Sequence, residues 1–241
     1  MAIAENLPTY RPPIPDRIRA QYEEGLSATL RWESGLLPSE RKESDLEHTR
    51  EMLIILEDIE QRCTILSSEI NLTTVAHMIY VHDGGEILAG DLAHSHPDYL
   101  DLKPKVKKRE LAAFRHLTRA IDDEAIRFLA RSLFKRAQTK APDDKEAQLT
   151  DFIDKTQAVR FGLANVFPGR NLRNSQRRTV QLNHAINALL KPGISLVRAL
   201  NSPYSKTEVL GLIEEELRAF IPHGYREHEI QPYIEQLKTA L

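Results

Sequence analysis

Apolar residues recur every three or four positions along most of the chain, which is typical of amphipathic α-helices. Between residues 45 and 63, for example, Met52, Ile55, Leu56 and Ile59 lie on one helical face. The same spacing predicts a helix from about residue 73 and others near 106–121, 123–138, 146–163, 179–191 and 206–219. Strand-like alternation is scarce and glycine is sparse, with 10 residues in 241. The pattern therefore predicts an all-α fold.

Proline and turn residues divide this helical pattern into three parts. Residues 1–16 contain four prolines, which prevent a continuing helix and indicate an extended arm. Residues 17–168 carry most of the predicted helices, interrupted by a loop at 141–144. Pro168-Gly169 and a change of composition indicate a soft boundary, followed by a helical C-terminal extension over residues 169–241. The role of that extension is not indicated by the sequence.

Charge and cysteine content narrow the classes of partner. The chain has 33 basic and 35 acidic residues, so it has no overall attraction to nucleic acid or an anionic membrane. The basic run 170–178 lacks interleaved aromatic residues, which also argues against nucleic-acid binding. A single cysteine, Cys63, excludes an intramolecular disulfide, and no apolar run approaches the roughly 18 residues that a membrane span needs. We expect a cytoplasmic protein.

Four polar residues are candidate metal ligands, and two of them, His48 and Asp154, stand in apolar helical contexts where burial requires a specific partner. His82 and Asp83 are adjacent at the predicted end of a helix, just before Gly84-Gly85, which favours a loop or kink. His48 lies one turn before Met52 on its apolar stripe, and Asp154 belongs to the helix near 146–163. A lone histidine of this kind is more often a hydrogen-bonded core residue than a ligand. The four together indicate a metal site.

Two imidazoles and two carboxylates suit a divalent ion, and Mn²⁺, Co²⁺, Mg²⁺, Zn²⁺ and Fe²⁺ all remain open. Such an ion acidifies a bound water and polarises a phosphoryl oxygen. His94 and His96 could add ligands for a second ion, although a surface loop closed by Pro97 is the favoured interpretation. This donor set favours a metal-dependent hydrolase.

Three segments resemble the HD-domain metal-dependent phosphohydrolases, and most closely their 5'-deoxynucleotidase branch. Residues 43–48 (ESDLEH) resemble the Glu-Ser-Val-Ala-Glu-His segment of that branch, and Ile153-Asp154-Lys155 resembles its late Asp-Lys. Residues 82–92 (HDGGEILAGDL) resemble its His-Asp-x-x-Glu-x-x-x-Gly-Asp-hydrophobic signature. The similarity covers roughly residues 27–165. It implies an HD-domain helical bundle, and it also implies a homodimer.

The resemblance assigns a role to each matching residue. It implies one divalent ion bound by His48, His82, Asp83 and Asp154, with Glu86 and Asp91 as the acid/base pair. It also implies that Arg31 binds a 5'-phosphate and that Trp32 crowds the 2' position of the sugar; a guanidinium can bind two phosphate oxygens at once. The interval from Arg31 to His48 is longer than expected of the branch, so Arg41 is an alternative phosphate ligand.

These observations predict a phosphohydrolase that removes phosphate from a small nucleotide. The first choice of substrate is a deoxynucleoside 5'-monophosphate, and the attacking group is metal-activated water. An alternative substrate is a nucleoside triphosphate, a cyclic nucleotide or a signalling nucleotide, since the motif alone does not separate these. A further alternative is a non-catalytic helical interaction protein with a structural metal. The presence of both Glu86 and Asp91 argues against the last reading.

Overall fold

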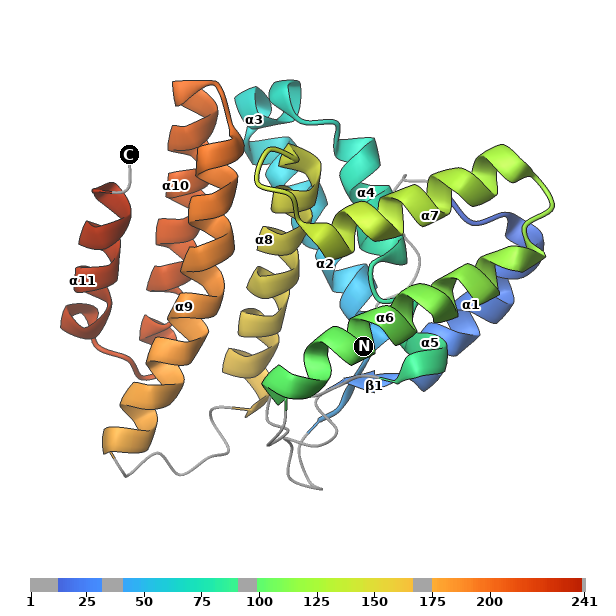
Figure 1. Cartoon of the computed structure of the whole chain (residues 1–241). Coiled ribbons are helices and arrows are strands. Elements are labelled where there is room, and N and C mark those ends of the chain that lie inside the picture. The colour runs from blue at the N-terminus through green and yellow to red at the C-terminus, as the bar shows by residue number, and fades with distance from the viewer. Residues whose placement is uncertain (1–12, 32–40, 91–98, 167–174, 240–241) are drawn as a thin grey trace. The chain divides into compact units, whose positions relative to one another are not determined.

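The computed structural model describes residues 13–31, 41–90, 99–166 and 175–239. These residues are almost entirely helical, which confirms the predicted all-α fold (Figure 1). They form two compact units, and each is described by itself. The first contains residues 13–31, 42–58, 73–90 and 99–139, and the second contains residue 41 and residues 59–72, 140–166 and 175–239.

The first unit is built around the predicted helix that carries His48. That helix is α2, Asp45–Arg62, of which the part up to residue 58 belongs to this unit. The remaining elements are α1 (Asp16–Ala28), β1 (Leu30–Arg31), β2 (Glu43–Ser44), α4 (Leu72–Val81), α5 (Glu86–Ala89), α6 (Tyr99–Leu117), η1 (Thr118–Ala120) and α7 (Glu124–Thr139). The two short strands pair antiparallel, with Arg31 opposite Glu43.

The core of the first unit is apolar and well packed. The rings of Phe114 in α6 and Phe134 in α7 stack with their centroids 4.2 Å apart. Leu26, Met52 and Ile79 from three other helices are completely buried. Because close-packed side chains of this kind resist displacement, they give the polar groups of the unit a rigid support.

The second unit is a set of packed helices. Its elements are α3 (Thr64–Glu69), α8 (Lys145–Phe161), the π-helical turn η2 (Gly162–Val166), α9 (Ser175–Ala199), α10 (Pro203–Arg218), η3 (Ile221–His223) and α11 (Glu227–Lys238). Helix α9 packs against both α8 and α10, and the three run side by side in Figure 1. A Cβ atom at Gly193 of α9 would lie 2.5 Å from Ile213 of α10, so glycine permits this close packing.

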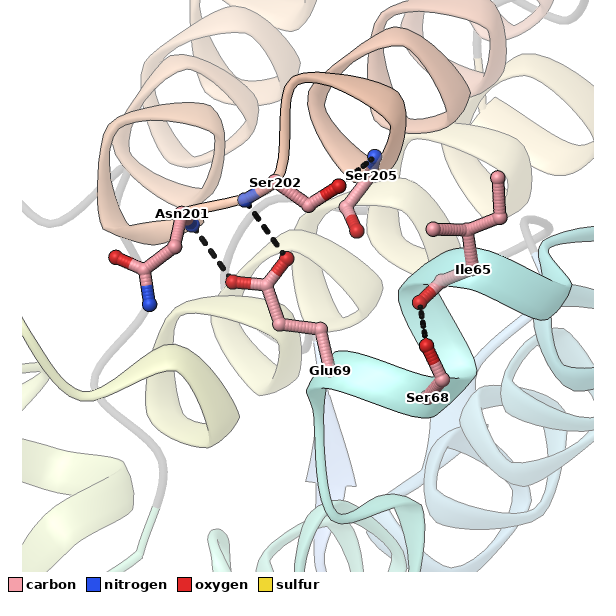
Figure 2. Close-up of a pocket in the computed structure, with 6 residues that line it drawn as sticks. All are labelled: Ile65, Ser68, Glu69, Asn201, Ser202 and Ser205. Carbon is pink, nitrogen blue, oxygen red and sulfur yellow. Dashed lines mark hydrogen bonds between the residues drawn. The ribbon is translucent and has the colours of Figure 1, made fainter.

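A polar pocket of about 480 Å³ lies at the N-terminus of α10 (Figure 2). Its central group is the Glu69 carboxylate, which accepts backbone N–H groups of Asn201 at 2.6 Å and Ser202 at 3.2 Å. Lys145 donates to the same carboxylate at 2.8 Å. Glu69 therefore already supplies the negative charge that a helix N-terminus favours.

Most of the predicted helices are confirmed, but several boundaries differ. Helix α6 begins at Tyr99, before the expected start near 106, and continues through Pro104. Pro104 is the sixth residue of α6, so the helix continues past it with the loss of the one intrahelical bond that its missing N–H would have made. Helices α1, α3, α5 and α11 and the strand pair were not predicted. The expected arm lies mostly outside the described residues, and the expected boundary near 168 lies there entirely.

None of the helices in the described parts of the chain is long and apolar enough to cross a membrane.

Candidate metal centre

His82 and Asp83 directly follow the last residue of α4, as the sequence predicts. The Nδ1 of His82 lies 2.6 Å from the backbone carbonyl oxygen of Ile79. A carbonyl oxygen only accepts, so Nδ1 carries a proton and donates it, which leaves Nε2 as the nitrogen that can face an ion. That Nε2 atom lies 3.0 Å from Oδ2 of Asp83. The doublet therefore presents one imidazole nitrogen and one carboxylate oxygen side by side.

The start of α2 brings a second imidazole to the doublet. Ser44 Oγ accepts the backbone N–H of Glu47 at 3.2 Å, while the Glu47 carboxylate accepts the backbone N–H of Ser44 at 3.0 Å. This capping box, which the Ser-x-x-Glu spacing of residues 44–47 indicates, fixes the first turn of the helix and thereby the position of His48. His48 is completely buried, and its Nε2 lies 3.8 Å from Asp83 Oδ2. The two imidazole rings are 5.4 Å apart.

Two glycines allow the surrounding helices to reach the doublet. A Cβ atom on Gly84 would lie 2.2 Å from the hydroxyl oxygen of Tyr22, and one on Gly85 would lie 2.7 Å from the backbone oxygen of Glu110. Any side chain at either position would force the neighbouring element away. The two glycines therefore allow close packing, in addition to ending α4 as expected.

Tyr22 and Gln138 each donate a hydrogen bond to the backbone at the end of α4. The Tyr22 hydroxyl donates to the carbonyl oxygen of Tyr80 at 3.1 Å, and the Gln138 amide donates to that of His82 at 2.8 Å. Burial, with the neighbouring Tyr80 and the charges of Asp83 and Asp45, raises the pKa of Tyr22, so its hydroxyl stays protonated. The two bonds tie the end of α4 to α1 and α7.

Arg31 of β1 lies against the carboxylate of the doublet. Its Nη1 is 2.5 Å from Asp83 Oδ2 and 3.8 Å from Asp45 Oδ1, and its Nε is 4.0 Å from Glu43 Oε2. Burial alone raises the pKa of Asp83, but His82, Arg31 and His48 outweigh it and hold that pKa well below its usual range. Asp83 is therefore ionised at neutral pH and ready to bind a cation.

Glu43 and Asp45 are site residues that the sequence reasoning missed. Both are buried, with 2% and 0% of their surface exposed. They flank the capping residue Ser44, where acidic residues are common simply because they favour a helix N-terminus. Glu43 lies opposite Arg31 because β1 pairs with β2, and no pattern in the sequence revealed this pairing.

The donor set of the first unit fits a divalent ion. His48, His82 and Asp83 each offer one ligand atom, and these atoms lie within 4.8 Å of one another. One ion could contact all three with small adjustments, because metal–nitrogen and metal–oxygen bonds are about 2.0–2.2 Å long. The carboxyl groups of Glu43, Asp45 and Asp83 all lie within 4.0 Å of the Arg31 guanidinium beside this cluster. Imidazole with carboxylate suits the borderline and hard divalent metals that the sequence analysis left open.

Other expected site residues are found in both units of the described chain. Glu86 begins α5 in the first unit and is half-buried. Asp154 lies in α8 of the second unit, is buried, and accepts a 2.6 Å bond from Lys155. Arg41 lies over the ring of Phe161, also in the second unit, at 5.7 Å from its centroid. The role of Asp154 as fourth metal ligand stays a prediction.

Four candidate residues lie outside the described residues. These are Trp32, Asp91, His94 and His96. Their expected roles in sugar recognition, proton transfer and binding of a second ion therefore also stay predictions.

Comparison with known proteins adds two findings. A family model described as HD domain matches residues 24–185, which is more than half of the chain. A solved structure described as "Predicted metal-dependent phosphohydrolase" from Magnetospirillum magnetotacticum MS-1 matches with a TM-score of 0.54 and 18% sequence identity. The match covers 84% of this chain and 95% of that one, and at this identity it shows a shared fold. The comparison with curated proteins gives no match.

Proposed function

Because the chain belongs to the HD-domain family, we propose that it is a metal-dependent phosphohydrolase acting on a small nucleotide, with a deoxynucleoside 5'-monophosphate as substrate. The observation that carries the proposal is the convergence of His48, His82 and Asp83, three potential ligand atoms within 4.8 Å of one another. The resemblance of residues 43–48 and 82–92 to the 5'-deoxynucleotidase branch supports the choice of substrate.

In this proposal His48, His82, Asp83 and Asp154 hold one divalent ion. When bound, the ion supplies a Lewis acid that makes water more acidic and withdraws charge from the phosphoryl group. His82 is prepared for binding because the bond to Ile79 fixes its tautomer, which an outer hydrogen bond commonly does for metal-ligating histidines. Asp83 contributes negative charge and is kept ionised by its neighbours.

Arg31 is the proposed ligand of the substrate phosphate. Its guanidinium is next to Asp83, so a phosphate that it binds lies beside the proposed ion site. Planar N–H donors can contact two phosphate oxygens at once, which orients the ester for attack. Trp32, the next residue, is proposed to exclude substrates with a 2' hydroxyl.

Glu86 and Asp91 are the proposed proton-transfer groups. Asp91 would orient and deprotonate the attacking water, and Glu86 would assist protonation of the leaving group. Glu86 follows the doublet by three residues, at the first position of α5 in the same unit. The pocket around Glu69 is a poor substrate site by comparison, because its N–H donors already bind the Glu69 carboxylate.

The test is phosphate release from a panel of ribo- and deoxynucleoside monophosphates by metal-stripped protein resupplied with Mn²⁺, Co²⁺ or Mg²⁺. Metal-dependent release that favours deoxynucleotides, and that is lost in Asp83→Ala, is the expected result. Asp101→Ala, a change of an exposed carboxylate in α6, is the matched control and should keep full activity.

Product analysis separates the remaining alternatives. Release of pyrophosphate or triphosphate would identify a nucleoside triphosphate as substrate, and a linear monophosphate would identify a cyclic one. No hydrolysis of any nucleotide by metal-loaded protein would reject the enzymatic proposal and favour an interaction protein with a structural metal.

A further inference from the structure

One carboxylate oxygen, Oδ2 of Asp83, is approached by three side chains. It lies 3.0 Å from Nε2 of His82, 3.8 Å from Nε2 of His48 and 2.5 Å from Nη1 of Arg31. The two imidazole nitrogens and this oxygen are the ligand atoms of the candidate metal centre. Arg31 therefore places a positive charge on the same oxygen that would bind the ion.

A second set of acceptors lies close to the same guanidinium. Asp45 Oδ1 is 3.8 Å from Nη1, and Glu43 Oε2 is 4.0 Å from Nε. Both distances exceed those of good hydrogen bonds, so a shift of about 1 Å would convert them into direct contacts. The side chain of Arg31 is 16% exposed, whereas both carboxylates are buried, so solvent screens these attractions only weakly.

The backbone fixes this second set of acceptors. Glu43 is held opposite Arg31 by the pairing of β1 with β2. The backbone N–H of Asp45 donates to the carbonyl oxygen of Thr29 at 3.0 Å, one residue before β1. The guanidinium therefore has two preformed positions, one on Asp83 and one on the pair Asp45 and Glu43.

We propose that Arg31 is an exchangeable counter-ion of the metal centre: it neutralises Asp83 in the metal-free protein and transfers to Asp45 and Glu43 when the ion binds Asp83. This inference rests on the metal centre of the proposed function, but it does not depend on the substrate. Two positive charges on one carboxylate oxygen repel each other, and transfer to the second pair of carboxylates relieves that repulsion. Asp45 and Glu43 thus act as positioning residues through Arg31.

The proposed transfer of Arg31 predicts how two variants change the affinity of the protein for a metal ion. Arg31→Gln removes the competitor and should tighten Mn²⁺ binding to metal-stripped protein by about tenfold. Asp45→Asn removes the nearer alternative acceptor, leaves Arg31 on Asp83 and should weaken binding by about tenfold. Both values are in the lower part of the range for groups that act on a metal through a ligand. Calorimetric titration with Mn²⁺ measures the dissociation constants directly, without any activity assay.

The double variant Arg31→Gln/Asp45→Asn distinguishes exchange from a general effect of charge. If Asp45 acts through Arg31, Asp45→Asn should change the affinity less than about twofold once Arg31 is absent. If Asp45 simply attracts the ion through its charge, the tenfold loss should appear in both backgrounds, and the exchange would be overturned. Weaker Mn²⁺ binding by Arg31→Gln alone would also overturn it. Glu51→Gln, a change of an exposed carboxylate in α2, is the control.

Two further measurements keep the result interpretable. Circular dichroism establishes that each variant is folded, and Glu43→Gln replaces Asp45→Asn in the cycle if the latter does not fold. Wild-type protein that binds no Mn²⁺ would overturn both the metal centre and the exchange. Protein that binds Mn²⁺ and shows the expected cycle, but hydrolyses no nucleotide, would leave the exchange supported and reject only the proposed function.

Discussion

The Nδ1–H of His82 donates to the backbone carbonyl oxygen of Ile79 at 2.6 Å, which leaves Nε2 as the nitrogen of the proposed metal ligand. Replacement by glutamine removes that nitrogen and the fixed tautomer together. We expect His82→Gln to weaken Mn²⁺ binding by more than about 100-fold, beyond the range of changes that act only through a ligand. Calorimetric titration of metal-stripped protein measures this effect.

His77→Gln is the matched control for the histidine variant. His77 lies in the same helix, α4, and is half-buried, but it is not one of the clustered ligand residues. Its replacement should leave the dissociation constant unchanged within about twofold. Unchanged affinity in His82→Gln itself would remove His82 from the ligand set.

Asp154 provides the test of the fourth predicted ligand. If Asp154 completes the metal centre, Asp154→Asn should weaken Mn²⁺ binding by at least about tenfold, because a neutral amide is a poorer ligand than a carboxylate. Asp151→Asn is the control, since Asp151 lies one turn earlier in α8 and pairs with Lys140. Equal affinities for the two variants would argue that Asp154 is a structural partner of Lys155.

The close approach at Gly85 predicts a large effect on stability. A Cβ atom there would lie 2.7 Å from the backbone oxygen of Glu110, and a backbone atom cannot turn aside as a flexible side chain can. We expect Gly85→Ala to lower the free energy of unfolding by about 1–3 kcal/mol, as overpacking typically does. Urea unfolding followed by circular dichroism gives this value.

At Gly211, unlike Gly85, an added side chain should stabilise the protein. It lies within α10, where an added Cβ would meet no atom within 4 Å. Gly211→Ala should therefore raise the free energy of unfolding by about 0.5–1 kcal/mol, because alanine favours the helix. Destabilisation of similar size in both variants would show that the contact with Glu110 does not decide the effect.

Local features of the fold followed from the sequence because neighbouring residues determine them. The spacing of Ser44 and Glu47, three positions apart, is that of a capping box, and the box is present with both of its hydrogen bonds. The apolar stripe through Met52 likewise predicted that His48 points inward, and His48 is completely buried. Periodicity also located most helices, although the first residues of α6 were missed because Pro104 suggested a helix boundary.

The environment of the candidate site could not be predicted in the same way. Arg31 was expected to contact phosphate, and its position against Asp83, 52 residues away, became evident only from the fold. The importance of Glu43 depends on a two-residue strand pair that gives almost no periodic signal. The need for glycine at position 85 comes from the backbone of α6, which no local pattern around Gly85 reveals.

The lowered pKa of Glu69 predicts how the stability of the chain depends on pH. Burial raises its pKa, but the N–H groups of Asn201 and Ser202, together with Lys145 and Ser205, outweigh burial and lower the pKa from 4.5 to about 2. The folded protein therefore favours the ionised carboxylate more than the unfolded chain does. Its contribution to stability is fully present above about pH 4.5 and is lost as the pH falls towards 2.

Replacement of Glu69 by glutamine should consequently lower the free energy of unfolding at neutral pH and have little effect on it in acid. We expect Glu69→Gln to lower the free energy of unfolding by about 1–3 kcal/mol at pH 7, a range that allows for partial solvent screening. The difference from wild type should shrink steadily in urea titrations between pH 5 and pH 3, because Glu69 of the unfolded wild-type chain takes up a proton there while the folded carboxylate stays ionised. Glu51→Gln, a change of an exposed carboxylate in α2, is the control. A difference that stayed constant down to pH 3 would mean that the Glu69 carboxylate acts by its shape rather than its charge.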